Sequence, residues 1–228
     1  MTQAIDAAPA VASAQQSLRI TEIFYSLQGE TRTVGLPTVF VRLTGCPLRC
    51  VYCDTEYAFH GGEQRSLENI LASVAEYGAG HVTVTGGEPL AQPGCLDLLQ
   101  HLCDRGYEVS LETSGAMSVA DVDPRVVKVL DLKTPASGEC ARNLYSNISH
   151  LLPGDQVKFV ICDRADYEWA RFKLDEFGLA QRVADVLFSP SFGQQNATEL
   201  ADWILADRLP VRLQLQLHKL LWNDEPGR

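Results

Sequence analysis

The chain has 228 residues, of which 46% are hydrophobic and 21% charged, and its 29 acidic and 19 basic residues give a formal net charge of −10. This composition is typical of a globular protein and excludes collagen-like repeats, wholesale disorder and small disulfide-knotted folds. The acidic balance argues against a broad grip on nucleic acid, and we expect no nucleic-acid partner. The chain shows neither an apolar run long enough for a transmembrane helix nor a signal peptide, so we expect no membrane association and a cytoplasmic location.

Residues 1–17 are rich in Ala and Gln and are predicted to form a flexible tail before a single domain over 18–228. From Leu18 onward, short β-rich runs alternate with amphipathic stretches, the rhythm of a sheet with crossover helices. Strands are predicted at 19–24, 38–43, 81–85, 108–112, 126–132, 156–161, 186–189 and 212–217. Helices are predicted over 66–77, 94–105, 142–150, 166–177 and 197–206.

The ends of these helices carry their own signals. Ser66 is a predicted N-cap, with Asn69 three residues later. Gly78, Gly106 and Gly178 each follow a helical pattern where a left-handed C-cap is wanted. Roughly 210 residues remain after the tail, fewer than the about 250 of a full eight-stranded barrel. The predicted fold is therefore α/β, a partial, open βα barrel with mostly parallel strands and a reduced number of helices.

A cysteine cluster follows the second predicted strand. Cys46, Cys50 and Cys53 share one short loop, and loops after strands are where α/β folds place their sites. In a reducing compartment such a cluster indicates metal binding before it indicates disulfides. Structural zinc takes four protein ligands, and His60 is the candidate fourth. The remaining cysteines are predicted to be buried structural thiols: Cys95, Cys103, Cys140 and Cys162.

An iron–sulfur cube is the alternative to zinc. Held by three cysteines, it leaves one iron free to bind a substrate or cofactor. The cysteines alone leave the choice open. The next predicted strand ends in Thr85-Gly86-Gly87-Glu88-Pro89, where glycines allow close approach of the backbone to a ligand. The cysteine loop and this turn, one βα unit apart, together resemble the radical S-adenosylmethionine (SAM) superfamily.

The superfamily resemblance implies a 4Fe-4S cluster on Cys46, Cys50 and Cys53, with SAM bound to the iron that has no protein ligand. One electron from the cluster then cleaves SAM to a 5′-deoxyadenosyl radical, which abstracts hydrogen from the substrate. The fold implied is the open βα barrel of the radical SAM type. The resemblance also places one set of residues against SAM: Tyr52, Asp54, Gly86, Gly87, Glu88, Gly115, Ser137, Ser189, Pro190 and Ser191, with Lys133 less certain.

Further segments resemble one family within this superfamily, 7-carboxy-7-deazaguanine synthase. They are 24–30 (FYSLQGE), 35–43, 53–55, 112–115, 131–138 and 216–219 ahead of Trp222, and they span nearly the whole chain after residue 18. The resemblance implies conversion of 6-carboxy-5,6,7,8-tetrahydropterin to 7-carboxy-7-deazaguanine with loss of ammonia, a carbon–nitrogen lyase reaction in queuosine-type 7-deazapurine biosynthesis. It further implies a Mg²⁺ ion, a flavodoxin-like or other electron donor, and a homodimer.

The same resemblance assigns the substrate and Mg²⁺ residues. Thr55 is the implied Mg²⁺ ligand, a hard hydroxyl oxygen. Arg42 can pair its planar fork with the substrate carboxylate. The other implied substrate contacts are Leu27, Gln28, Gly29, Thr113, His218 and Pro226. No protein side chain is a predicted catalytic residue, because the radical belongs to the cofactor.

Each assignment has a plainer alternative. Gln28-Gly29 alone is an ordinary turn, and Arg42 can pair with a structural carboxylate. Glu63, Glu112 and Asp131 are acid/base groups or solvated charges at the ends of elements. Many family members have a glycine where this chain has Thr31, so we expect a restricted substrate loop. A zinc-stabilised binding module and a radical SAM activase of a partner enzyme are the competing functions.

Overall fold

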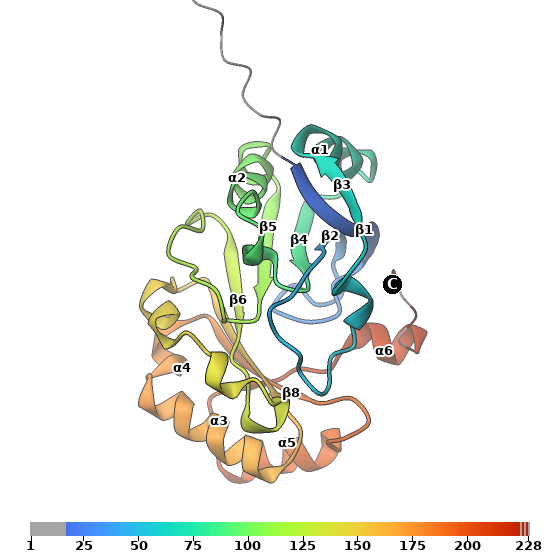
Figure 1. Cartoon of the computed structure of the whole chain (residues 1–228). Coiled ribbons are helices and arrows are strands. Elements are labelled where there is room, and N and C mark those ends of the chain that lie inside the picture. The colour runs from blue at the N-terminus through green and yellow to red at the C-terminus, as the bar shows by residue number, and fades with distance from the viewer. Residues whose placement is uncertain (1–16, 224, 226, 228) are drawn as a thin grey trace, which may run out of the picture.

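The structure is a computed structural model that describes residues 17–223, 225 and 227 (Figure 1). Its framework is a nine-stranded sheet in the order β3-β1-β2-β4-β5-β6-β7-β8-β9. The strands are β1 Ser17–Leu27, β2 Pro37–Leu43, β3 Glu63–Ser66, β4 His81–Gly86, β5 Glu108–Thr113, β6 Val127–Asp131, β7 Gln156–Ile161, β8 Asp185–Pro190 and β9 Arg212–Leu213. β1 runs antiparallel to β2 and β3, and every later pair is parallel. The predicted open, mostly parallel βα barrel is confirmed.

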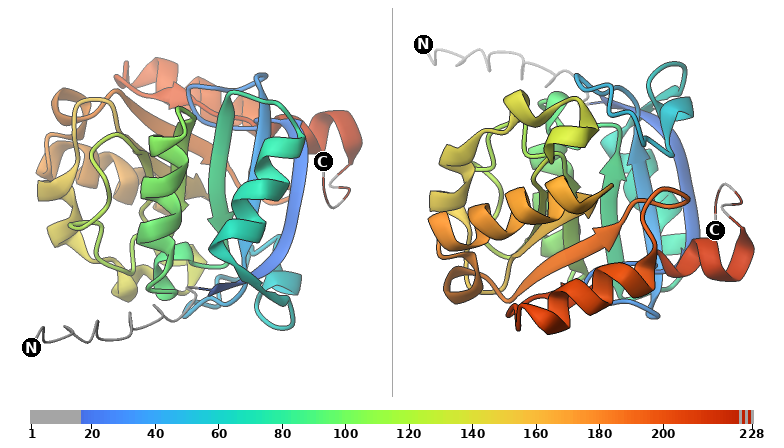
Figure 2. Two further views of the ribbon diagram at one scale, coloured as in Figure 1. Left: turned by 90° about the horizontal axis from the view of Figure 1, so that it is seen from above. Right: turned by 90° about the horizontal axis from the view of Figure 1, so that it is seen from below.

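Helices pack against the outside of this sheet. The α-helices are α1 Leu67–Glu76, α2 Cys95–Asp104, α3 Arg164–Glu176, α4 Leu179–Arg182, α5 Ala197–Ala206 and α6 Leu217–Trp222. α1 contacts β1 and β3, α2 contacts β5, α3 contacts β7 and α5 contacts β9. Figure 2 shows α1 and α2 side by side on one half of the curved sheet, and α3 and α5 on the other. No helix in the described part of the chain has the length and apolarity needed to cross a membrane.

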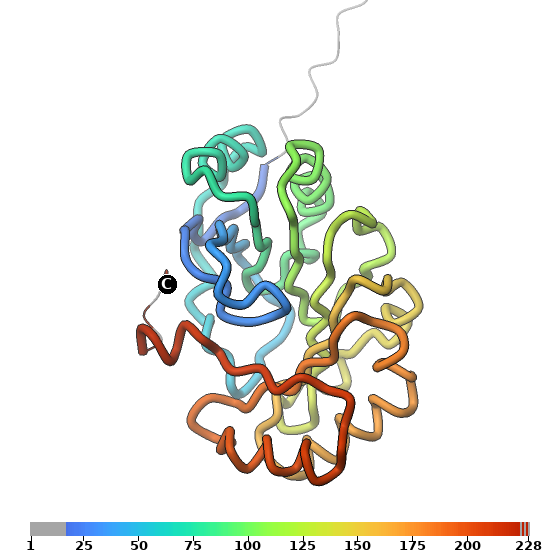
Figure 3. Tube along the Cα trace, turned by 180° about the vertical axis from the view of Figure 1, so that it is seen from behind, coloured from blue at the N-terminus to red at the C-terminus, as the bar shows by residue number. Residues whose placement is uncertain are grey.

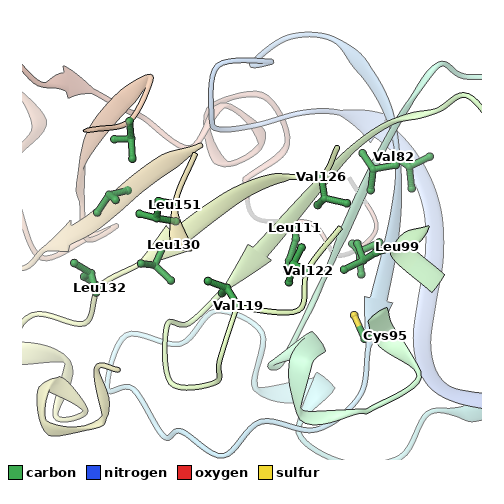
Figure 4. Close-up of a cluster of buried hydrophobic side chains, with 14 of the residues drawn as sticks. Val82, Cys95, Leu99, Leu111, Val119, Val122, Val126, Leu130, Leu132 and Leu151 are labelled. Atoms are coloured by element: carbon green, nitrogen blue, oxygen red, sulfur yellow. The ribbon is translucent and has the colours of Figure 1, made fainter. Parts of the chain in front are cut away.

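The buried core fills the space between strands and helices. Val82 on β4 and Leu111 on β5 lie with Cys95 and Leu99 of α2 in one apolar cluster, which continues to Leu130 of β6 (Figure 4). All five side chains are at most 1% exposed. Parallel strands covered on their faces need such apolar runs. This packing anchors the strands, so that the loops at their carboxyl ends start from fixed positions.

The helix ends agree with the sequence signals. The Ser66 hydroxyl accepts a hydrogen bond from the Asn69 backbone N–H at 3.2 Å, which satisfies a donor that the first turn of a helix leaves open. Gly78, Gly106 and Gly178 have φ of 64°, 84° and 58°, the left-handed conformation that ends helices. Both predictions are confirmed.

The structure differs from the predicted elements in several places. Residues 142–150 are not an α-helix but two 3₁₀ turns, Cys140–Arg142 and Tyr145–His150. Asn147, on the second turn, is buried and donates to the carbonyls of Gly115 and Met117, so an inward polar side chain replaces the apolar stripe of a helix. The strand predicted at 212–217 is only Arg212–Leu213, because the chain turns into α6. β3 was missed, and Ser17, predicted as tail, begins β1; residues 1–16 lie outside the described residues.

Thr31 stands where many members of the resembled family have glycine. Its φ is 66°, in the left-handed region where a β-branched residue is strained and glycine is not. The side chain is buried and its hydroxyl shares a hydrogen bond of 3.0 Å with the Thr33 hydroxyl. The loop thus keeps a glycine-type conformation although it carries threonine.

Candidate active site at the carboxyl ends of the strands

A cavity of about 650 Å³ opens where the carboxyl ends of the parallel strands meet. The cysteine loop forms one side of it, and α6 forms another with the loop that follows β1. Figure 3 shows the C-terminal segment passing beside that N-terminal loop, and the Leu217 N–H donates to the Gly29 carbonyl at 2.9 Å. The cavity therefore brings together residues from both ends of the chain.

Cys46, Cys50 and Cys53 all line this cavity. Their loop is fixed from outside, since the Val51 N–H donates to the Ser137 carbonyl at 3.1 Å. Burial raises the pKa of each thiol, that of Cys50 to about 11. Because a thiol binds iron as thiolate, binding of a cluster has to release these protons.

The structure does not assemble the alternative zinc site. His60 is exposed and does not line the cavity. Among the described residues, no group of three or more His, Cys, Asp or Glu side chains converges as a ligand set for a metal ion. Four ligands of one zinc ion must meet tightly, whereas an iron–sulfur cube spaces its thiolates around a larger body. The three cysteine thiols around the cavity therefore suit an iron–sulfur cube rather than a single zinc ion.

The glycine turn after β4 packs directly against the cysteine loop. A Cβ on Gly86 would lie 2.2 Å from the Leu43 carbonyl oxygen, and one on Gly87 would lie 2.2 Å from that of Gly45. Either contact is impossible without moving the backbone. Both glycines line the cavity, so glycine is required here for the approach of two protein loops as well as for any ligand.

Glu88 has a different position from the one expected of a SAM contact. It is 0% exposed and is absent from the cavity lining. Its carboxylate accepts hydrogen bonds from the Thr113 hydroxyl and from the Ser114 backbone and hydroxyl, at 2.5–3.0 Å. The side chain thus ties the end of β4 to the end of β5 and supports the cavity from behind.

Two polar atoms on the cavity wall are buried without a partner in the described structure, the Tyr52 hydroxyl and Asp131 Oδ1. Burial first, and the nearby Asp131 charge second, raise the pKa of Tyr52 far above its ordinary value. Asp131 Oδ2 pairs with Lys133 Nζ at 2.9 Å. Burial would lower the pKa of Lys133, but the Asp131 carboxylate raises it above its ordinary value. Tyr52 and Asp131 thus each carry a hydrogen-bonding atom left unfilled by the described protein groups.

The cavity lining also includes the residues expected to hold substrate. Gln28 is 2% exposed and donates to the Thr83 hydroxyl at 3.0 Å. Lys158 pairs with Glu30, whose other oxygen accepts from Gln216 at 3.0 Å. Burial, then the Glu30 charge, raises the pKa of Glu112. These lining residues offer charged and amide groups to a polar planar molecule.

Thr55 lies in the cavity beside a link to the C-terminal helix. Its hydroxyl donates to Asp54 Oδ1 at 2.8 Å, and Lys219 Nζ donates to Asp54 Oδ2 at 2.7 Å. Burial alone would raise the pKa of Asp54, but the Lys219 ammonium holds it well below its ordinary value. The ion pair ties α6 to the cysteine loop.

Most of the predicted site residues meet in this one cavity. Those that line it are Leu27, Gln28, Gly29, Arg42, Cys46, Cys50, Tyr52, Cys53, Asp54, Thr55, Gly86, Gly87, Thr113, Ser189, Ser191 and His218. Those in the described part of the chain that do not are Glu88, Gly115, Ser137 and Pro190. Pro226 lies outside the described residues, and Glu63 is exposed on β3.

The cavity also contains residues that sequence reasoning missed. Thr85, Glu30, Lys158, Gln216 and Lys219 all line it. Lys158 had a readable signal, because a lysine stands inside the otherwise apolar run of β7. The others stand in segments that carry the family resemblance or the glycine turn, but sequence reasoning assigned them no role of their own.

Comparison with known proteins agrees with this geometry. The radical SAM superfamily model matches residues 40–131, which contain the cysteine loop and the glycine turn. The 7-carboxy-7-deazaguanine synthase of Koribacter versatilis is 46% identical over 222 residues, covering 91% of this chain and 98% of that protein. The chain belongs to the 7-carboxy-7-deazaguanine synthase family.

Other relatives extend the likeness. The 7-carboxy-7-deazaguanine synthase of Chlorobaculum tepidum is 44% identical, over 93% of this chain and 98% of that protein. The crystal structure of QueE from Escherichia coli is 26% identical with a TM-score of 0.72, covering 89% of this chain and 95% of that chain. Streptococcus suis SuiB, at 15% identity and a TM-score of 0.53, shares the fold over 75% of this chain. Relatives in this family thus match nearly the whole chain.

Proposed function

We propose that this protein converts 6-carboxy-5,6,7,8-tetrahydropterin to 7-carboxy-7-deazaguanine with release of ammonia. Family membership over nine-tenths of the chain supports the proposal. The observation that carries it is the cavity itself, which is lined by three thiols and by amide and charged groups. A radical SAM lyase needs a cluster, SAM and a polar substrate in one enclosed space.

The residues present fit the cofactors of the family. Cys46, Cys50 and Cys53 supply the thiolate donors of a 4Fe-4S cluster. The unpartnered Tyr52 hydroxyl and Asp131 Oδ1 suit a ligand with hydroxyl groups, as the ribose of SAM has. Thr55 offers a hard oxygen to Mg²⁺. Together, the bound cluster and SAM supply the radical that removes hydrogen from the substrate.

The protein's own groups bind and orient the pterin. Arg42 pairs with the substrate carboxylate, and the Gln28 segment faces the donor and acceptor edge of the pterin. Burial raises the pKa of Glu112. Its carboxyl lies at the cavity wall, where it can exchange a proton with the substrate. α6, tied down by Lys219 and Asp54, helps to exclude water.

The remaining SAM and substrate assignments belong to this proposal. Ser189 and Ser191 would contact SAM from the end of β8, and Thr113 and His218 would contact substrate. His218 lies against the loop after β1, where a Cβ on Gly29 would be 2.4 Å from its Nδ1. Glu88, Gly115, Ser137 and Pro190 stay predicted SAM contacts, although they do not line the cavity.

We also propose a cytoplasmic homodimer that receives electrons from a flavodoxin-like donor, with residues 18–228 acting as one domain. The exposed, stacked pair Tyr25 and Tyr77, with ring centroids 5.8 Å apart, supports an interface between two copies. Burial of apolar surface of this kind favours association. Light scattering on the purified protein tests the dimer: a mass near twice 25.1 kDa is expected, and a mass near the single value would contradict it.

Turnover with defined components tests the main proposal. Anaerobically reconstituted protein is incubated with SAM, a chemical reductant and the carboxytetrahydropterin, and deazaguanine and ammonia are quantified. Equal amounts of both products are expected. Absence of both from protein carrying about four irons per chain would refute the lyase assignment. Colourless, zinc-loaded protein would instead favour the binding module, and a glycyl radical raised in a partner enzyme would favour the activase.

A further inference from the structure

The pairing of β1 with β2 contains an irregularity that determines which residue lies opposite Arg42. Ile20 pairs with Leu43, but the next pair is Glu22 with Arg42, so one extra residue of β1 lies between them. Such a β-bulge re-aims the side chains that follow it. It places Glu22, rather than Thr21, directly across from Arg42. Opposed residues of an antiparallel pair project from the same face of the sheet.

Glu22 holds the Arg42 guanidinium at one nitrogen, and Tyr57 in turn holds the Glu22 carboxylate. Nε donates to Glu22 Oε1 at 2.6 Å, and the Tyr57 hydroxyl donates to the same oxygen at 2.8 Å. Burial raises the pKa of Tyr57 to about 12; the Arg42 charge opposes this rise and the hydrogen bond to Glu22 adds to it. The phenol therefore remains a donor at neutral pH.

Aromatic rings confine the guanidinium on its flat sides. Its central carbon lies 5.6 Å from the centre of the Phe24 ring and 5.8 Å from that of Tyr57. Phe24 is itself stacked on Phe40, with ring centres 4.9 Å apart. Cation–π contacts of this kind favour one orientation of the planar group. Arg42 and these three rings all line the cavity.

The terminal nitrogens of Arg42 are the part of the side chain left for a ligand. Within the described part of the chain, its hydrogen bonds to protein are made by Nε. The side chain is 15% exposed and that of Glu22 is 23% exposed. A bidentate carboxylate site needs two parallel N–H donors in a fixed direction.

We infer that Glu22, assisted by Tyr57, is a positioning residue that fixes Arg42 so that its terminal nitrogens bind the substrate carboxylate. This inference rests on the proposed function. It also distinguishes two effects of opposite sign. As a mere counter-ion, Glu22 would compete with the substrate for the arginine charge, and its removal would tighten binding. As a positioning residue, it strengthens binding, and its removal weakens it.

Equilibrium binding to cluster-free protein tests the inference without turnover. The probes are the carboxytetrahydropterin and the same tetrahydropterin without its carboxylate, followed by fluorescence. Glu22→Ala is expected to raise the Kd of the first about tenfold to a hundredfold and to leave that of the second unchanged. Glu22→Gln retains an oxygen acceptor for Nε and is expected to restore most of the affinity. Tyr57→Phe is expected to produce a smaller loss.

Kinetics on cluster-loaded protein supply the second readout. Glu22→Ala is expected to raise KM for the pterin with little change in kcat or in KM for SAM. Asp185→Ala is the matched control, because Asp185 pairs with Arg212 at 3.1 Å beside a separate cavity; both KM values should match the wild type. In an Arg42→Ala background, Glu22→Ala should have little further effect.

Two results would overturn the inference. One is unchanged or tighter binding of the carboxytetrahydropterin by Glu22→Ala. The other is an equal loss of affinity for both pterins, which would show general damage to the cavity. If the wild-type protein converts the pterin while either result holds, only the positioning role fails. If the wild type neither binds nor converts it, the proposed function fails as well.

Discussion

Two buried lysine–carboxylate pairs on the same strand show how this fold separates stability from binding. At the amino end of β6, Lys128 pairs with Asp155 at 2.9 Å, with both side chains 2% exposed. Asp155 also accepts from the Lys128 and Leu152 backbone N–H groups. At the carboxyl end, Asp131 pairs with Lys133, but its Oδ1 has no partner in the described structure. The first pair is complete, and the second retains an acceptor without a protein partner in the described structure.

The difference follows from the cost of burying charge. A buried carboxylate is tolerated when its hydrogen-bonding capacity is filled. Asp155 fills it with protein groups and contributes nothing to the cavity. Asp131 and Tyr52 retain open capacity where the cavity lies, as preorganised binding groups do. Changes at the two ends of β6 should therefore have opposite consequences.

Loss of a thiol at the carboxyl end should have the largest effect on function. Cys50→Ala is expected to abolish both the iron–sulfur absorption and turnover, because three thiolates act as a unit. The unfolding free energy of the cluster-free protein should change by about 1 kcal/mol or less. Iron analysis and denaturant unfolding check both. Cys103→Ala, on α2, is the control and should retain iron; iron retained by Cys50→Ala would contradict the assignment.

Breaking the complete pair, Lys128 with Asp155, should have the largest effect on stability. Asp155→Ala leaves Lys128 buried without its charge partner, which is expected to cost about 3–5 kcal/mol of unfolding free energy. The molecules that remain folded should bind SAM as the wild type does. Urea unfolding measures the first effect and equilibrium binding the second. A loss below about 1 kcal/mol would show that the pair is unimportant for the fold.

Changing the incomplete pair should weaken SAM binding, which Asp155→Ala should leave unchanged. Asp131→Asn is expected to raise the Kd for SAM about tenfold, the value of one charged hydrogen bond. Tyr52→Phe removes an unpartnered hydroxyl and should weaken SAM binding without lowering stability. Calorimetry on cluster-loaded protein measures both. Unchanged SAM affinity in the two variants would mean that the open atoms serve another ligand.

Replacing Glu112 should have the smallest effect on the free energy of unfolding, and the size of this effect depends on pH. Burial raises its pKa, so the fold favours the protonated carboxyl, and this stabilising contribution is lost as pH rises through the folded-state pKa. Glu112→Gln does not titrate. Its unfolding free energy relative to wild type should therefore increase from pH 5 to pH 8, as measured by urea unfolding of cluster-free protein. A difference that stays constant or falls with pH would contradict the raised pKa.

The sequence predicted those features that are local. The cysteine spacing, the glycine turn and the alternating strands each lie within a few residues, and the structure places them at one end of the sheet. The helix predicted at 142–150 was wrong because Asn147 bonds inward to backbone carbonyls, which periodicity cannot reveal. β3 is a short, polar edge strand without an alternating pattern.

Contacts between residues far apart in the chain could not be predicted from the sequence. Lys219 and Asp54 are separated by 165 positions, and Gln216 and Glu30 by 186. The partner of Arg42 depends on a β-bulge, and one residue more or less would have turned Glu22 to the other face. A resemblance names residues that touch a ligand, but the structure is needed to find those that hold them in place.

The central claim is that three cysteines leave one iron of the cluster open to SAM. Electron paramagnetic resonance of the reduced cluster, recorded with and without SAM under anaerobic conditions, tests it most directly. The account predicts that SAM changes the spectrum of the cluster, because its ligation changes. A spectrum identical with and without saturating SAM would show that every iron already has a protein ligand, and would contradict the account.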